Sequence, residues 1–266
     1  KNPIIIPSGH NFVINAGVNL KMAENTYIMI VNGNLKFKGD INNRIVIDSI
    51  NKKKVWKGIY VNSDFKVKNN SIIKNADILN FSYFDNEKIQ LTGGINFFKG
   101  DVEILNTFIK NSYAEDAINL VKSNFKISNL KINRAISDGV DIDFGNGVIE
   151  DSDFDKISGD AIDFSGSLAK LKNLNISDIQ DKGVSAGEET KLKINNIKID
   201  SARIGIAAKD SSIVEGSKIE ISNCGLFDFA SYQKKSYFSG AYLKISANTS
   251  CKTSLSHKGS ELIINN

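Results

Sequence analysis

Residues 139–164 read GVDIDFGNGVIEDSDFDKISGDAIDF, and this stretch begins and ends with the same pattern. In both copies a small residue is followed by a β-branched residue, an acidic residue and a large apolar residue. Working outward from this stretch, the small residue recurs every 22 residues, at positions 117, 139, 161, 183 and 205. A spacing that holds over several intervals indicates a structural repeat.

A second column of polar residues runs in step with the first. Its members lie between apolar pairs and are 22 or 23 residues apart. Asn and Asp tolerate the left-handed backbone of a tight turn, and stacked Asn side chains can hydrogen-bond along the stacking direction. The column therefore predicts one corner of each repeat. Its members are Asn106, Asn129, Asp151, Asn173 and Asn196.

The repeat unit contains strands and turns but no helix. The segment Val140-Asp141-Ile142-Asp143-Phe144 alternates with the period of two that a strand requires. Stacking such units in parallel pairs every strand and buries one of its faces. The prediction is an all-β fold, a single-stranded right-handed parallel β-helix (solenoid) of roughly ten coils with a C-terminal cap.

We expect a single β-helix domain over residues 1–266. The interval from Gly58 to Gly94 is longer than one repeat, so a longer loop is predicted near 64–70 or 85–90. The predicted sections are irregular N-terminal coils at 1–57, regular 22-residue coils at about 58–226 and a capping segment at about 227–266.

The composition limits the classes of partner. The net charge is +4, yet the only arginines are Arg44, Arg134 and Arg203, whereas proteins that bind nucleic acid favour arginine. We therefore expect no nucleic-acid partner. No apolar run is long enough to cross a bilayer, so no membrane span is expected. The first residue is Lys1 rather than Met, which indicates a processed or trimmed product. The sequence leaves the oligomeric state open.

The two cysteines, Cys224 and Cys251, are too few for a disulfide framework. A single bridge and two buried free thiols are both compatible with the sequence. If the protein is exported, we expect the two residues to lie close enough to bridge.

Strand alternation places the β-branched residue of each repeat in the core and the next residue outside. Asp141 and Asp163 would then stand about 5 Å apart, and Asp143 and Asp163 roughly 7–8 Å apart. These separations fall within the ranges used by glycosidases that work with two carboxylates. The candidate catalytic residues are Asp141, Asp163, Asp143 and Asp160. The predicted outward column reads Tyr60, Asn96, Asn119, Asp141, Asp163, Ser185, Ala207 and Phe227.

The candidate substrate-binding residues surround these carboxylates. Asp138 and Lys182 lie just before the same strands, and aromatic rings suit the faces of sugars. Two other interpretations of the acidic residues stay open: a solvated sheet face with ordinary turn chemistry, and Ca²⁺ binding through several carboxylates. No metal-ligand constellation or cofactor motif is present. The three candidate aromatic residues are Tyr60, Phe98 and Phe227.

The N-terminal segments Ile6-Pro7-Ser8-Gly9, Val31-Asn32-Gly33-Asn34-Leu35 and Trp56-Lys57-Gly58-Ile59 resemble the opening coils of right-handed β-helix repeat proteins of bacterial surfaces and secretions. The later repeats resemble those of the pectin-lyase-like superfamily. This resemblance implies an extracytoplasmic location, in the periplasm, on the cell surface or secreted. It also implies that a polysaccharide lies along the strand that follows the small residue.

The resemblance to polygalacturonases, which are pectin-lyase-like enzymes, is incomplete. Ser137-Asp138-Gly139 and Gly159-Asp160-Ala161 resemble two of their acidic motifs, but Lys182-Gly183 stands where a histidine motif is expected. The basic residues of that family are missing. We therefore expect an extracytoplasmic β-helix that binds a polysaccharide or serves as a non-catalytic surface module. The alternative is a polysaccharide-active enzyme (a glycoside hydrolase, lyase or epimerase) that uses the acidic patch, and the sequence leaves catalysis undecided.

Overall fold

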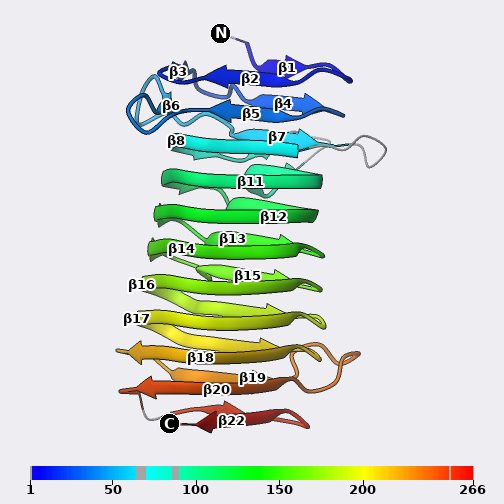
Figure 1. The fold of residues 1–266 in the computed structure, drawn as a ribbon, viewed down its shortest axis with the longest axis vertical. Coiled ribbons are helices and arrows are strands. Elements are labelled where there is room, and N and C mark those ends of the chain that lie inside the picture. The colour runs from blue at the N-terminus through cyan, green and yellow to red at the C-terminus, as the bar shows by residue number, and fades with distance from the viewer. Residues whose placement is uncertain (1, 64–69, 86–89, 252, 266) are drawn as a thin grey trace. The chain divides into compact units, whose positions relative to one another are not determined.

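The computed structural model describes residues 2–63, 70–85, 90–251 and 253–265. In these residues the chain is all-β, and no helix that could cross a membrane is present in them. The chain divides into two compact units, Lys1–Ser137 and Asp138–Asn266. Within each unit the strands stack as successive coils (Figure 1). The predicted loops near 64–70 and 85–90 lie largely outside the described residues.

The first unit is a parallel β-solenoid. The inward residues Ile4, Ile28, Ile59, Ile95 and Ile118 pair in register from coil to coil. Because Ile59 pairs directly with Ile95, the long interval after Gly58 forms a single coil. The strands are β1 (Ile4–Ile6), β2 (Phe12–Asn15), β3 (Asn19–Met22), β4 (Ile28–Val31), β5 (Leu35–Lys38), β6 (Ile45–Ser49), β7 (Ile59–Asn62), β8 (Asn70–Ser82), β9 (Phe84–Asp85), β10 (Gln90–Leu91), β11 (Gly93–Tyr113) and β12 (Asp116–Ala135).

The second unit has the same construction. The inward residues Val140, Ile162, Val184, Ile206 and Phe229 pair in register and are fully buried. The two units together hold about eleven turns, against the roughly ten that were predicted. The strands are β13 (Asp138–Asp143), β14 (Asn146–Ile157), β15 (Ile162–Ser165), β16 (Leu168–Gly187), β17 (Lys191–Lys209), β18 (Ile213–Ser222), β19 (Phe227–Tyr232), β20 (Tyr242–Thr249), β21 (Leu255–Ser256) and β22 (Glu261–Asn265).

The predicted polar column forms one corner of the coils. All five members have left-handed backbone, with φ between 48° and 56°. Within the first unit Asn129 donates to Asn106 at 3.0 Å, and within the second Asn173 donates to Asp151 at 2.7 Å. Asn196 continues this ladder by donating to Asn173 at 2.9 Å. The prediction of an Asn-rich corner is confirmed.

This ladder gives the first testable prediction. Replacing Asn173 with Ala removes two ladder hydrogen bonds and places in left-handed backbone a residue that lacks the polar side chain by which Asn tolerates it. We expect a loss of about 2 kcal/mol in the free energy of unfolding, measured by urea denaturation. Asn173→Gly also removes the hydrogen bonds, but glycine adopts left-handed backbone without strain. This variant should lose only about half as much free energy of unfolding. Asn248, an exposed residue of β20 outside the corner, serves as the control, and equal losses for Asn173→Ala and Asn248→Ala would contradict the ladder.

The parallel pairing continues beyond position 226, where the 22-residue spacing fades. β18 pairs with β20, and β20 pairs with β22, each in parallel. Cys224 and Cys251 form a disulfide across these coils, with their Cα atoms 5.8 Å apart. The prediction that the two cysteines lie within bridging distance is confirmed.

Candidate acid–lysine site

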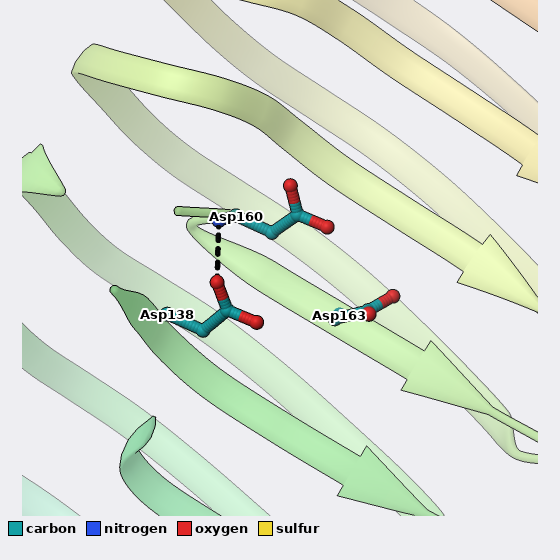
Figure 2. A group of neighbouring side chains, drawn as sticks. All are labelled: Asp138, Asp160 and Asp163. Carbon is teal, nitrogen blue, oxygen red and sulfur yellow. Dashed lines mark hydrogen bonds between the residues drawn. The ribbon is translucent and has the colours of Figure 1, made fainter. Parts of the chain in front are cut away.

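Three carboxylates meet on adjacent coils of the second unit. Asp138 begins β13, Asp160 precedes β15, and Asp163 lies within β15 (Figure 2). Their nearest carboxylate oxygens all lie within 4.8 Å of one another. The stacking of the coils produces this arrangement, because residues 22 positions apart fall on neighbouring strands.

Asp138 and Asp160 each bridge to the next coil. The carboxylate of Asp138 accepts a hydrogen bond from the backbone N–H of Asp160 at 2.8 Å. Asp160 in turn accepts from the backbone N–H of Lys182 at 2.9 Å and from its Nζ at 3.1 Å. The same ammonium group donates to Asp181 at 2.6 Å. Asp138 and Asp160 therefore have a structural role, because each joins its own coil to the next by a hydrogen bond. Together with Lys182 they also form a cluster of charged groups.

The Asp160–Lys182 pair is shielded from water. Side-chain exposure is 7% for Asp160 and 13% for Lys182. Burial and the neighbouring Asp163 raise the pKa of Asp160, while Lys182 opposes that rise. Burial by itself lowers the pKa of Lys182. The negative charges and hydrogen bonds of Asp160 and Asp181 have the larger effect, so the pKa of the lysine is raised. The ammonium group is therefore charged at neutral pH.

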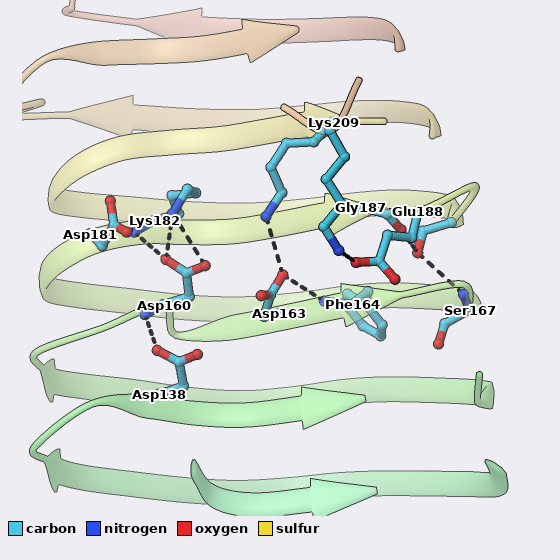
Figure 3. Close-up of polar contacts among 12 residues, drawn as sticks. Asp138, Asp160, Asp163, Phe164, Ser167, Asp181, Lys182, Gly187, Glu188 and Lys209 are labelled. Atoms are coloured by element: carbon cyan, nitrogen blue, oxygen red, sulfur yellow. Dashed lines mark hydrogen bonds and ion pairs between the residues drawn. The ribbon is translucent and has the colours of Figure 1, made fainter. Parts of the chain in front are cut away.

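A second buried lysine approaches Asp163 from two coils away. Lys209 lies in β17, and its Nζ is 3.7 Å from the carboxylate of Asp163 (Figure 3). Gly187 lies between them in sequence, and a Cβ placed there would be in ordinary van der Waals contact with the Lys209 side chain, at 3.4 Å. We call Asp138, Asp160, Asp163, Lys182 and Lys209 the acid–lysine cluster.

Asp143 lies at the edge of this cluster. Its side chain is half-buried, and burial is the main cause that raises its pKa. The negative charges of Glu188 and Asp163 raise it further, and Lys235 acts in the opposite direction. Lys235 forms an ion pair with Glu188. A carboxyl group with a raised pKa beside a second carboxyl group is an arrangement that acid–base chemistry uses.

The three clustered carboxylates also bear on the Ca²⁺ interpretation. Calcium takes six to eight oxygen ligands. Asp160 and Asp163 already face the ammonium groups of Lys182 and Lys209, which supply the positive charge that a cation would bring. The residues present are therefore better suited to paired charges than to a calcium cage.

Residues 116–266 match the protein family described as a right-handed β-helix region. The chain belongs to this family. The predicted handedness and the predicted fold are thereby confirmed. No curated protein sequence matches the chain.

Two solved structures share the fold of this β-helix protein. A mutant of the periplasmic alginate epimerase AlgG superposes with a TM-score of 0.64 at 11% identity, covering 99% of this chain and 76% of that one. The catalytic domain of a GH87 α-1,3-glucanase in complex with nigerose gives 0.59 at 14% identity, covering 99% and 52%. The β-helix protein thus spans about half the length of the glucanase chain. At these identities the likeness concerns the fold alone.

The sequence-predicted carboxylates come together in the β-helix protein. Asp141 pairs in register with Asp163, as the outward column predicts. The structure brings Asp138, Asp160 and Asp163 into one cluster and places Asp143 beside them. Lys182, the predicted substrate-binding cation, is the partner of Asp160.

Two outward residues of the first unit are not exposed as predicted. Tyr60 is 4% exposed, because β9 places Phe84 against its ring and Tyr27 packs on both. Asn119 is also buried and donates to Asp116 at 3.1 Å. Phe98 is 38% exposed, with the Lys99 ammonium 4.9 Å from the centre of its ring.

The predicted register of Phe227 is wrong by three residues. Ala207 pairs with Ala230, and Phe227 pairs with Ile204. The small residue Gly225 follows Gly205 after only 20 residues and suggests the predicted register, whereas paired residues of β17 and β19 are 23 positions apart. Phe227 is half-buried and packs on the small apolar cluster of Ile204, Ala207 and Ala230.

Sequence reasoning missed several members of the charged surroundings. Lys209, Asp181, Glu188 and Lys235 all contribute to the pairs described above. The sequence contained one signal for Lys209. It lies one 22-residue repeat after Gly187, and a long side chain can extend over a glycine. Glu188 and Lys235 come together through the segment between β19 and β20, which has no counterpart in the repeat.

Proposed function

We propose that the chain is an extracytoplasmic β-helix protein that binds a polysaccharide through the acid–lysine cluster. The observation that carries the proposal is the convergence of three carboxylates within 4.8 Å, paired with two buried lysines. Carboxylates accept hydrogen bonds from sugar hydroxyls, and ammonium groups donate to hydroxyl, ring and carboxylate oxygens. The cluster thus offers both kinds of partner side by side.

The energetic cost of the cluster supports a functional role. Removing charged groups from water costs several kcal/mol per ion unless they are well paired, and apolar residues of similar size usually serve stability as well. Grouped, buried charges of this kind are therefore candidates for a functional site. The two structural neighbours, an alginate epimerase and an α-1,3-glucanase, direct the choice of polysaccharides to test.

The disulfide supports the extracytoplasmic part of the proposal. Disulfides persist in oxidising compartments and are rare in reducing ones. Cys224 and Cys251 form such a bridge, and the alginate epimerase neighbour is described as periplasmic.

Binding to alginate, α-1,3-glucan, polygalacturonate and unrelated neutral glucans tests the proposal. We expect one class to bind, and the double variant Asp141→Asn, Asp163→Asn to weaken that binding about tenfold or more, because charge-assisted hydrogen bonds are lost. Asp200→Asn, which alters an exposed carboxylate of β17, should bind as the wild type does. The melting temperature of each variant shows whether the fold is retained. Unchanged affinity in the folded double variant would refute the proposal.

A second candidate function is catalysis, favoured by the raised pKa of Asp143 beside Asp163. Here Asp143 serves as general acid and Asp163 as the second carboxyl group of the pair. Turnover would then fall as the pH rises through the pKa of Asp143, since the acid form is lost. Release of reducing ends and absorbance of unsaturated uronates measure turnover. Asp143→Asn should abolish it while binding persists, and absence of turnover on every polysaccharide bound would exclude this candidate.

A further inference from the structure

A groove lies on another sheet of the second unit, formed by β14, β16, β17, β18 and β20. It consists of two adjoining hollows of about 410 Å³ and about 390 Å³. Both are lined by Lys193 and Glu215, so they form one continuous depression. None of its residues belongs to the acid–lysine cluster.

Four exposed lysines line this groove: Lys170, Lys191, Lys193 and Lys244. Lys170 and Lys193 pair directly in register on neighbouring strands, about 4.8 Å apart at the backbone. Like charges directly opposite one another in a sheet are unfavourable. In the described part of the chain none of the four ammonium groups forms an ion pair, and Glu215 is the one acidic residue among the lining residues.

The floor of the groove is aliphatic. Leu168 and Ile213 are 55% and 41% exposed. They flank Lys191 in register on the adjoining strands. Among the described lining residues there is no aromatic ring, and single-stranded nucleic acids are held mainly by aromatic stacking together with arginine.

We propose that this groove binds an acidic polysaccharide, a chain of uronic acid residues that crosses the strands. Lys170 and Lys193 stand at the strand spacing and match two carboxylates repeated once per sugar, while Glu215 lies in register between Lys193 and Lys244. The aliphatic floor suits the C–H faces of the rings, and bound carboxylates relieve the repulsion between Lys170 and Lys193. The inference rests on the proposed function only in taking the polymer to be a polysaccharide, and it adds both a second binding surface and the charge class of the sugar.

The test measures the binding of fluorescent oligogalacturonate to the full chain, by anisotropy at low and at high salt. We expect the double variant Lys170→Gln, Lys193→Gln to weaken binding about tenfold, and high salt to weaken binding to the wild type. Lys156→Gln, Lys198→Gln is the matched control, because both of its lysines are exposed and already have carboxylate partners. The control should bind as the wild type does.

Three outcomes overturn the inference. These are equal loss in the control, equal binding of a neutral glucan, and equal or tighter binding of oligothymidylate, which would indicate a nucleic-acid groove. The variant Asp141→Asn, Asp163→Asn separates this inference from the proposed function. If the groove binds and the acid–lysine cluster does not, only the lysine variant loses affinity; in the opposite case only the aspartate variant does.

Discussion

Replacing Lys182 with Met should reduce the free energy of unfolding by about 3–5 kcal/mol at pH 7, because it leaves Asp160 buried without its cation. The ammonium group of Lys182 lies 3.1 Å from the carboxylate of Asp160 and 2.6 Å from that of Asp181. The carboxyl group of Asp163 lies within 4.8 Å of that of Asp160. Urea denaturation measures the loss. Lys198→Met removes an exposed lysine whose pair with Glu220 has both side chains at least 60% exposed, and should cost little.

The same variant has a defined pH dependence. The pKa of Asp160 is already raised by burial and by Asp163, and loss of Lys182 raises it further. A carboxyl group whose pKa is higher in the folded than in the unfolded protein favours folding at low pH, and this contribution is lost as the pH rises through the folded pKa. The deficit of Lys182→Met should therefore shrink as the pH falls toward the ordinary aspartate range. Adding Asp160→Asn should recover much of the stability at pH 7, and a deficit that is independent of pH would contradict the buried-pair explanation.

The fold could be predicted because the features that determine it are local and repeat along the chain. Ile118, Val140 and Ile162 occupy equivalent core positions in coils of equal length, so counting 22 residues gives their place. Asn129 and Asn173 signal a left-handed corner by residue type alone. Phe227 is misplaced because the small residue Gly225 lies only 20 residues after Gly205, and following it sets Phe227 opposite Ala207, whereas the partner of Ala207 is Ala230.

The candidate site could be predicted only in part. The column of carboxylates follows from the repeat, so Asp138, Asp160 and Asp163 were found. The lysines that pair with these carboxylates are harder to predict, because the length of a side chain decides which carboxylate it contacts. The side chain of Lys209 extends over Gly187 to Asp163, two coils away, and counting residues along the repeat does not show this contact. Tyr60 was assigned to the surface because the hairpin that places Phe84 over it lies in an insertion outside the repeat.

Removing the Cys224–Cys251 bridge should cost about 3 kcal/mol and should act mainly on the C-terminal coils. The bridge closes a loop of 27 residues, and constraining a loop of this length in the unfolded chain accounts for that magnitude. β22 pairs in parallel with β20, β20 pairs in parallel with β18, and in a solenoid each coil depends on its neighbours. We expect Cys224→Ser, Cys251→Ser to lower the melting temperature and to speed proteolysis within 230–265.

A reducing agent should do the same to the wild type and nothing to the double variant, because only the wild type has a bridge to reduce. If reduction left the melting temperature of the wild type unchanged, the bridge would have no role in holding these coils.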